Sequence, residues 1–585
     1  MHTNLRSFIQ QLKNEKDIVE ITAEVDPCLE IPEIHRRIID EEGPALLFTK
    51  VKGSAFPVVT NLFGTRRRVD MSVGPKPEEL VRKAVTSLDK LLPPKASALW
   101  AERHWLLEFA KAGLKKVGPG KAPVLEYKDS AVNLHQLPAL TGWQEDGGPF
   151  VTLPLVYTEH PVTKEHNLGM YRMQIFSENQ TGMHWQIHKG GGFHHYEAEQ
   201  RGQALPVTVF LGGPPALILS AIAPVPEMLP ELIFTSFLMG GKLNRVEVEG
   251  HPHALIAEAE FALCGEVPPK VRRPEGPFGD HYGYYSWIHD FPVFNVNKIY
   301  RRKDAIYPAT VVGKPRQEDY FIGEYLQSLL SPMFPVVMPG VKSLWTYGET
   351  GFHSLAAAVV RESYYREAMA HAFRIMGEGQ LTLTKFLMVT DAVVDLADFA
   401  QLLENLLARF NPARDLLIVN DTSMDTLDYT GRQLNKGSKA IMTGLGEPIR
   451  QLPREYQGGP IYGIKKVKSY CGGCLVISGP GFVEDEGLAG EIIKRNQQEL
   501  APWPMVVLVD DADAIHDQTS FLWTVFTRFD PAHDIYADAE IKHNKIQYRG
   551  PILIDARMKP QYPDELFPRE DIVNLVDRRW KEYFK

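Results

Sequence analysis

Cysteine is scarce in this chain, which has only four among 585 residues. So few and scattered thiols exclude the disulfide framework of a small secreted domain and a four-thiolate zinc site. Cys471 and Cys474 have the C-x-x-C spacing of redox proteins, but they lead into the apolar run Leu475–Ser478. That run favours a turn before a strand over a reactive pair. A reducing compartment is therefore expected.

Long apolar runs and a net positive charge are also missing. The most apolar stretch, residues 205–229, is interrupted by Gly212–Pro215 and by further prolines, so it does not predict a membrane-spanning helix. The net charge of −9 argues against general nucleic-acid binding, since the basic clusters are short. The first residues lack the features of a signal peptide, and a cytoplasmic protein is expected.

The composition, with 44% hydrophobic and 23% charged residues, is that of a globular α/β multidomain protein. Residues 1–118 mix amphipathic helices with short strands and predict a small α/β domain. Residues 119–318 contain many short strands separated by glycine and proline, which is typical of a sandwich or a partly open barrel. Beyond residue 318 the pattern is again α/β.

An internal repeat occupies this last part of the chain. A strand ending at Asp391 and a later Asp415 recur as Asp510 and Asp534, in each case 119 residues further on. Asp398 and Asp517 keep the same offset. We interpret the repeat as a duplicated α/β module with a first copy at 319–440 and a second at 441–585, structural rather than catalytic.

Two carboxylates stand on a stiff turn within residues 273–285. Glu275 and Asp280 are separated by Gly276, Pro277 and Gly279, residues that cannot continue a helix. Paired carboxylates in different environments can have their pKa values pushed apart, so that one stays ionised while the other gives up a proton. The turn is a candidate acid/base site, although such residues more often form an ordinary surface turn.

A second polar cluster is expected on a β-hairpin. If residues 183–188 form a strand, its period of two places three polar side chains on one face: His184, Gln186 and His188. A turn through residues 177–182 that pairs position 172 with position 188 would set Arg172 beside His188. With the nearby Gly190–Gly192 run, this face suits an anionic ligand. The alternative is the solvated side of a sheet.

A third candidate is Glu231, at the start of an apolar helix expected over residues 230–239. A carboxylate there complements the helix dipole. Together with Asn167 and His188 it would instead form a donor set suited to Mn²⁺ or Mg²⁺, although no sequence spacing joins the three residues.

In this order, these segments resemble the motifs of the UbiD-type decarboxylases, enzymes that use prenylated FMN. The matching segments are Asn167–Arg172, Trp185–Gly191, Glu231, Glu275–Asp280 and Gly283–Tyr285, with supporting matches at Val25–Pro27, Gly43–Phe48, Asn61–Gly64 and Gly313–Pro315. The resemblance extends from the N-terminus to about residue 440. It implies that residues 119–318 form a split β-barrel that binds the flavin.

The resemblance also implies roles for particular residues. Asn167, His188 and Glu231 would hold a divalent metal, usually manganese. The cofactor would be cradled by Met170, Tyr171, Arg172, His184, Trp185, Gln186, Lys189 and Gly190. A potassium ion would bind to backbone carbonyls near residues 168, 220, 221 and 223. Arg172, Glu275 and Asp280 would form an ionic catalytic trio.

The implied reaction is the removal of CO₂ from an unsaturated or aromatic acid, with the modified flavin as electron sink. Arg172 would keep Glu275 ionised, while Asp280, in a closed pocket, would be protonated near neutral pH and deliver the proton. Aspartate at position 280 resembles the quinone-biosynthesis branch of the family, so the resemblance favours an aromatic hydroxy-carboxylate of ubiquinone or menaquinone biosynthesis. Another aryl or acrylic acid is the alternative. A flavin prenyltransferase would supply the cofactor, and a homo-oligomer is expected.

Two other classes of function fit part of the pattern. A non-catalytic flavin- or phosphate-binding protein would keep the hairpin and the metal residues, but it would not need both Glu275 and Asp280. A metal-dependent hydrolase could use the same ligands with a bound water. A flavin absorbance band would separate that hydrolase from a decarboxylase.

Overall fold

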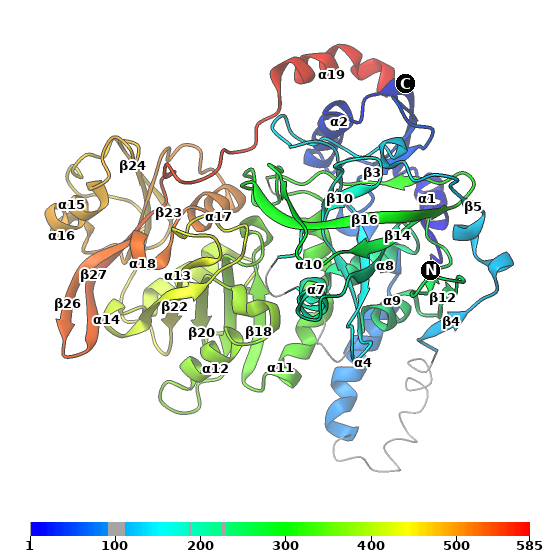
Figure 1. The fold of residues 1–585 in the computed structure, drawn as a ribbon. Coiled ribbons are helices and arrows are strands. Elements are labelled where there is room, and N and C mark those ends of the chain that lie inside the picture. Colours follow the sequence, from blue (N-terminus) through cyan, green and yellow to red (C-terminus); the bar gives the residue numbers. More distant parts are fainter. Residues whose placement is uncertain (1, 92–110, 187–188, 225–229, 315, 585) are drawn as a thin grey trace. The chain divides into compact units, whose positions relative to one another are not determined.

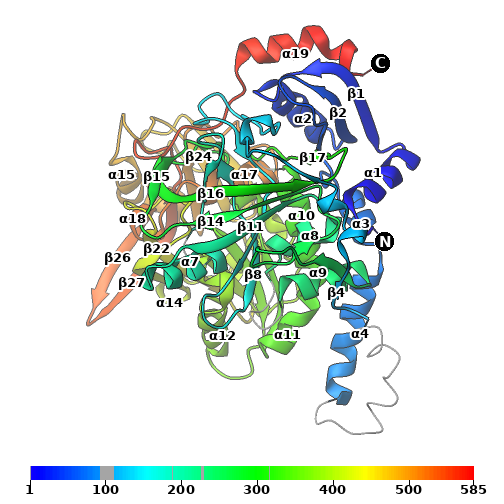
Figure 2. The ribbon, with the colours of Figure 1, turned by 45° about the vertical axis from the view of Figure 1, so that its right-hand side comes forward.

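The computed structural model describes residues 2–91, 111–186, 189–224, 230–314 and 316–584 (Figures 1 and 2). The chain forms two compact units: the first comprises Met1–Leu329 with Asp564–Lys585, and the second comprises Leu330–Pro563. Each unit buries its own clusters of apolar side chains. No helix in the described ranges is both long and apolar enough to cross a lipid bilayer.

The first unit begins with a small sheet of strand order β1-β2-β3-β17, namely Ile18–Val25, Ala45–Val51, Val58–Thr60 and Tyr307–Pro308. β1 and β2 are parallel, and α2 (Glu30–Asp40) connects them. Ile31, Ile34 and Ile38 of α2 follow helical spacing and are buried, which anchors the helix on the core. The other N-terminal helices are α1 (Leu5–Asn14), α3 (Arg66–Val73) and α4 (Lys76–Leu91).

A larger sheet, eight-stranded over the described residues, forms the centre of the first unit. Its main path runs β10 (Gln180–Gly182), β16 (His289–Arg301), β14 (Phe261–Val267), β11 (Leu205–Leu211), β7 (Leu155–Glu159) and β8 (His166–Met170). The long strand β16 also pairs with β15 (Arg272–Glu275) and β5 (Tyr127–Lys128). This unit further contains α7 (Gly190–Gln200), α8 (Pro215–Ile222), α9 (Glu231–Met239), β6 (Phe150–Val151) with β9 (Met173–Gln174), and β4 (Leu114–Lys116), β12 (Leu243–Val246) and β13 (Leu255–Ile256).

The hairpin expected before α7 exists, but its predicted register is wrong. Ile175 faces Thr181, and the His184 N–H donates to the Arg172 carbonyl at 3.4 Å, so position 172 faces 184 rather than 188. The chain turns earlier than expected: the Ser177 N–H donates to the Gln180 carbonyl at 3.2 Å and closes a tight turn there. Residues 183–186 are not a strand, and residues 187–188 lie outside the described residues.

The second unit contains two five-stranded sheets of the same topology, in a part of the chain that is described throughout. The first has the order β18-β19-β20-β22-β21: Val341–Thr346, Leu355–Val360, Phe386–Thr390, Lys436–Gly444 and Leu416–Ser423. The second has the order β23-β24-β25-β27-β26: Lys466–Cys471, Cys474–Ser478, Met505–Val509, Lys545–Asp555 and Ile535–Lys542. Parallel and antiparallel pairs occur at the same places, as expected for a duplication.

The repeated aspartates have a structural role. Asp398 caps α13 (Phe399–Arg409) and Asp517 caps α17 (Gln518–Phe526), each accepting a backbone N–H of the first turn. Cys471 and Cys474 face each other across a two-glycine hairpin turn, both buried, as expected for a turn before a strand. The remaining helices of this unit are α11 (Phe334–Val337), α12 (Glu367–Ile375), α14 (Pro412–Asp415), α15 (Leu488–Arg495), α16 (Gln497–Leu500) and α18 (Pro531–Asp534), and α10 (Glu318–Leu330) precedes it.

The end of the chain returns to the first unit, whereas the sequence placed residues 441–585 together. α19 (Glu570–Tyr583) packs on α2 (Figure 1), where the Tyr583 hydroxyl donates to Glu30 at 2.5 Å and Arg37 pairs with Asp577 at 2.6 Å. In the second unit, β22 continues to Gly444, past the boundary expected at 440. The return of α19 depends on contacts between residues more than 500 positions apart, which no local sequence pattern records.

Candidate active site

The two carboxylates lie on the segment that follows β15. Glu275 is the last residue of β15 and faces His289 of β16. Asp280 lies at the turn of a short hairpin, in which its N–H donates to the Tyr284 carbonyl at 3.0 Å and its own carbonyl accepts the Gly283 N–H at 2.9 Å. Both side chains are buried, Glu275 completely and Asp280 to 6% exposure. The alternative of an ordinary surface turn does not describe this segment.

The approach of this segment to its neighbours requires glycine at position 279. A Cβ atom there would lie 2.1 Å from the Trp143 ring. The Gly279 N–H donates to Asp146 Oδ1 at 2.8 Å, and Asp146 Oδ2 accepts the Gly142 and Trp143 N–H groups. Asp146 therefore ties residues 142–146 to the carboxylate segment.

Arg172 joins the two carboxylates. It follows β8, and its guanidinium donates to Glu275 Oε1 at 3.0 Å and to Asp280 Oδ2. The third donor reaches Ser286 Oγ at 3.0 Å, and the guanidinium lies over the Phe278 ring at 4.6 Å. Two acids close together in the sequence thus share one buried cation from more than a hundred positions earlier, the geometry in which charge-assisted hydrogen bonds are strong.

His184 and Gln186 extend this network. His184 Nδ1 lies 2.9 Å from Glu275 Oε1, and its other ring nitrogen lies 3.2 Å from the Gln186 amide nitrogen. Burial lowers the pKa of His184, with a further contribution from Arg172, so the ring is neutral near pH 7. Arg172 is consequently the permanent cation of the cluster.

Both carboxylates are ionised in this structure. Burial raises the pKa of Glu275, but contacts with His184 and Arg172 outweigh it, and the pKa lies below its ordinary value. Burial likewise opposes ionisation of Asp280, yet Arg172 and His281 lower the pKa of Asp280 to about 2. The prediction of a protonated Asp280 does not hold in this structure, because Arg172 contacts both acids rather than Glu275 alone.

These pKa shifts predict acid sensitivity. A carboxyl whose pKa is lower in the folded state adds stability above its unfolded pKa, near 4, and loses that stability as the pH falls through the folded pKa. For Asp280 the shift corresponds to roughly 2–3 kcal/mol. The difference in unfolding free energy between wild type and Asp280→Asn should be largest at pH 7 and shrink towards pH 3 in urea titrations. A difference independent of pH would contradict the assignment.

Some of the residues expected to hold a cofactor lie at the end of β8 and the start of α7. Met170 ends β8, Tyr171 follows it and is buried, and Lys189 and Gly190 begin α7. A Cβ atom at Gly190 would lie 1.9 Å from Asn167 Oδ1, so α7 can start this close to β8 only with glycine. Trp185 is buried, and its ring N–H has no partner among the described residues.

Of the three expected metal ligands, two can be placed. The Leu168 N–H, next to Asn167, donates to Glu231 Oε2 at 3.4 Å, which brings β8 and the first residue of α9 together. The Asn167 side-chain amide lies 3.3 Å from the Tyr171 hydroxyl. Burial raises the pKa of Glu231. His188 lies outside the described residues.

Domain models of one family match along the chain. The N-terminal, Rift-related and C-terminal domains of 3-octaprenyl-4-hydroxybenzoate carboxy-lyase, UbiD, match residues 9–88, 115–315, and 320–444 with 484–553. The chain belongs to the UbiD family. The resemblance seen in the sequence motifs is thereby confirmed, and the protein is an enzyme, a carboxy-lyase.

Similar UbiD-family proteins include one from Chlamydia pneumoniae that is named as part of a 4-hydroxybenzoate decarboxylase. It is 51% identical over 584 residues, which cover 99% of this chain and 98% of that protein. A protein of Chlamydia caviae is also 51% identical over 584 residues, covering 100% of this chain and 99% of its own. Alignments of this length cover the second unit with both copies of its duplicated module.

Solved UbiD-class structures share the fold. The closed form of vanillic acid decarboxylase from Sedimentibacter hydroxybenzoicus matches with a TM-score of 0.68 and 23% identity, covering 79% of this chain and 96% of that one. HmfF from Pelotomaculum thermopropionicum, in complex with FMN, matches with a TM-score of 0.63 and 23% identity, covering 79% and 98%. Identity this low establishes the architecture alone.

Sequence reasoning missed three residues of this UbiD-family site. Ser286 accepts hydrogen bonds from Arg172 and from the Phe278 N–H, and His281 contacts Asp280 through both its N–H and its ring. Asp146 supports the carboxylate segment from 129 positions before Glu275. His281 could have been found from its place beside Asp280, whereas no local signal marks Ser286 or Asp146.

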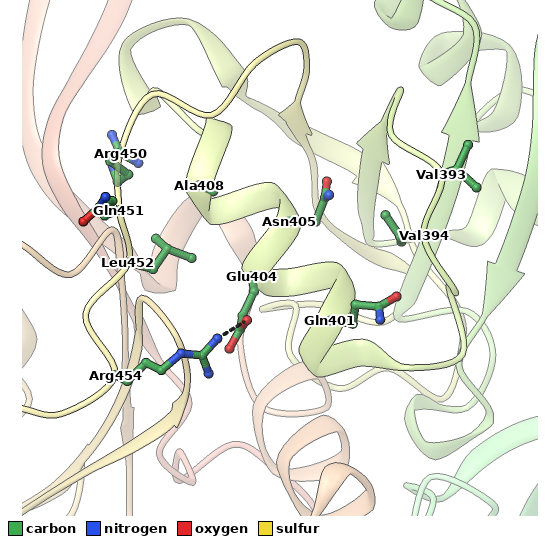
Figure 3. A pocket seen from close by; sticks show the side chains of 10 residues that line it. All are labelled: Val393, Val394, Gln401, Glu404, Asn405, Ala408, Arg450, Gln451, Leu452 and Arg454. Atoms are coloured by element: carbon green, nitrogen blue, oxygen red, sulfur yellow. Dashed lines mark hydrogen bonds and ion pairs between the residues drawn. The ribbon is translucent and has the colours of Figure 1, made fainter.

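The second unit contains a hollow of about 680 Å³, lined by residues that are distant in the sequence from the active-site residues. It is formed along α13 and the segment around Arg454, which pairs with Glu404 at 2.9 Å (Figure 3). None of the residues expected at the active site lines it. We therefore assign this hollow no part in the UbiD chemistry, whatever its size.

Proposed function

We propose that this enzyme decarboxylates an aromatic hydroxy-carboxylate of ubiquinone or menaquinone biosynthesis, with prenylated FMN and a divalent metal as cofactors. The observation that carries the proposal is the buried contact of Arg172 with both Glu275 and Asp280. A cation between two acids can bind a substrate carboxylate while keeping a proton donor beside it.

Two buried polar atoms support a place for the flavin. Glu275 Oε2 and the Trp185 ring N–H have no hydrogen-bond partner among the described residues, although burial makes an unpaired polar group costly. Trp185 is one of the residues implied for cofactor binding, with Met170, Tyr171, Arg172, His184, Gln186, Lys189 and Gly190, whereas Glu275 belongs to the implied catalytic trio. The edges of a flavin ring carry hydrogen-bond donors and acceptors that could pair with these two groups.

The ends of helices support sites for the phosphate and the cations. α7 begins at three successive glycines, and a helix N-terminus with close backbone access favours a phosphate group. Asn167, His188 and Glu231 would hold Mn²⁺ or another divalent ion there, as hard oxygen and imidazole donors suit it. The carbonyls of Ser220, Ala221 and Ala223, at the C-terminus of α8, would bind K⁺.

The protein's own residues would orient the substrate and move the proton. Prenylated FMN, when bound, supplies the electron sink that lets CO₂ leave. Arg172 would bind the substrate carboxylate, and a third acid on one guanidinium raises the pKa of Asp280 from about 2. Asp280 would then take up a proton and deliver it to the carbon that has lost CO₂. His281, hydrogen-bonded to Asp280 and partly exposed, connects that carboxyl to solvent.

A second candidate is a simple hydroxybenzoate without a prenyl chain. The name of the Chlamydia pneumoniae relative, which refers to a 4-hydroxybenzoate decarboxylase, favours this substrate. The proposal further includes a split β-barrel around the flavin and a homo-oligomer.

The test is a comparison of substrates with a defined cofactor. The protein would be co-produced with a flavin prenyltransferase, the bound cofactor identified by mass, and CO₂ release measured from prenylated hydroxybenzoate, dihydroxynaphthoate and 4-hydroxybenzoate. We expect release only from the prenylated-FMN form. No release from any aryl or acrylic acid, with that cofactor present, would overturn the proposal.

A further inference from the structure

The hairpin that carries Asp280 is paired along its outer edge with the returning end of the chain. This Asp280 hairpin, residues 278–286, is closed by the Ser286 N–H, which donates to the Phe278 carbonyl at 2.8 Å. On the other side, the Tyr285 N–H donates to the Asp564 carbonyl at 2.9 Å, and the Leu566 N–H donates to the Gly283 carbonyl at 3.0 Å. Residues 564–566, the C-terminal strap, thus form an antiparallel bridge with Tyr284.

One side chain fixes the strap in place. Leu566 is 1% exposed and packs with Trp143 and Tyr285. Trp143 is the ring that the Gly279 backbone approaches, and its own N–H donates to the Val312 carbonyl at 2.8 Å. Leu566 therefore fills the space behind the hairpin on which Asp280 stands. Beside it, Glu565 pairs with Lys314.

The backbone connects the strap to Asp280 in few steps. The Tyr284 residue that faces Glu565 also accepts the Asp280 N–H through its carbonyl, at 3.0 Å. Gly283, which accepts the Leu566 N–H, donates to the Asp280 carbonyl at 2.9 Å. A displacement of residues 283–285 would therefore reach the Asp280 backbone through two hydrogen bonds. The Asp280 carboxylate would then move out of its hydrogen-bonding position beside Arg172.

We propose that the C-terminal strap is a positioning element for Asp280. It pairs with the 283–285 edge of the hairpin, whereas Asp146 binds the opposite edge at Gly279, so that the carboxylate stays within reach of Arg172 and the substrate. Leu566 is the positioning residue, and it acts through the hairpin rather than on the substrate. The kinetic part of this inference rests on the proposed role of Asp280 as proton donor.

The test compares three variants of the full-length enzyme loaded with prenylated FMN. Leu566→Ala empties the space behind Tyr285, and we expect kcat to fall roughly 10- to 100-fold with KM changed less than about threefold, as for a misplaced catalytic group. Leu566→Met keeps the volume and should remain within about threefold of wild type. The control Phe567→Ala alters the neighbouring side chain, which is 57% exposed, and should leave kcat unchanged.

A second readout does not depend on activity. Hydrogen exchange followed by mass spectrometry should show the peptide over residues 278–286 exchanging at least about tenfold faster in Leu566→Ala, while the β11 peptide, Leu205–Leu211, is unchanged. Unchanged exchange at 278–286 would overturn the strap's role, as would unchanged kcat in an enzyme whose wild type releases CO₂. Faster exchange in a protein that decarboxylates nothing would instead reject the proposed function and keep the strap as the support of the hairpin.

Discussion

Replacing Asp280 with asparagine is expected to lower kcat by roughly 10²–10⁴-fold, the usual contribution of a general acid. Asparagine keeps an oxygen that can accept the His281 N–H, and the buried volume hardly changes. It cannot hold a transferable proton, and it removes one of the two negative charges on Arg172. Cofactor content, read from the flavin absorbance, should remain close to that of wild type.

The matched control for this variant is Asp290→Asn, an exposed carboxylate on the strand that pairs with β15. Like Asp280→Asn, this substitution removes one negative charge, but it does not alter Arg172, Glu275 or Asp280. It should therefore retain the wild-type kcat. Substantial turnover by Asp280→Asn with bound cofactor would remove Asp280 from the role of proton donor.

Replacing Arg172 with methionine is expected to have the largest effect on stability. Glu275 and Asp280 would both be left buried without their cation, and loss of one partner from a buried pair costs about 3–5 kcal/mol. The pKa of each carboxyl would rise, so protonation should recover part of the lost stability at low pH. Decarboxylation should fall below detection, since substrate binding and charge balance both depend on Arg172.

Urea unfolding at pH 7 and pH 4 would check this result. The loss of unfolding free energy should be greater at pH 7, where both carboxyls would otherwise be charged. The control is Arg272→Met, which removes a partly exposed pair with Glu199 at 2.9 Å and should cost no more than about 1 kcal/mol. Equal effects of the two substitutions would mean that Arg172 is not the buried cation of the site.

The outcome at the hairpin before α7 illustrates the limit of pattern reasoning. Alternation of polar and apolar residues located the polar cluster, but alternation has the same period in every register. The turn is closed by the hydrogen bond from the Ser177 N–H to the Gln180 carbonyl, so position 172 faces 184 instead of 188. The contact between Arg172 and Glu275 was nevertheless expected, because the order of the motifs identified both residues. That identification does not depend on how the strands pair.

The protonation of Asp280 shows a second limit. A pKa depends on every charged or hydrogen-bonding group within a few ångströms, and for Asp280 the strongest of these are Arg172 and His281. The sequence suggests that a carboxylate is buried, which raises its pKa. The sequence does not show that the guanidinium of Arg172 reaches both acids. That contact lowers the pKa of Asp280 instead of raising it.

By itself, the sequence determined the family, the carboxy-lyase class, the α/β duplication and the identity of the carboxylates on a stiff turn, because these follow from local pattern and ordered motifs. Only the tertiary structure decided which groups share Arg172, that Ser286 and Asp146 support the site, and that residues 564–566 return to brace the Asp280 hairpin. Such contacts join segments separated by more than a hundred residues. They arise from packing and backbone pairing, for which no spacing rule exists in the sequence.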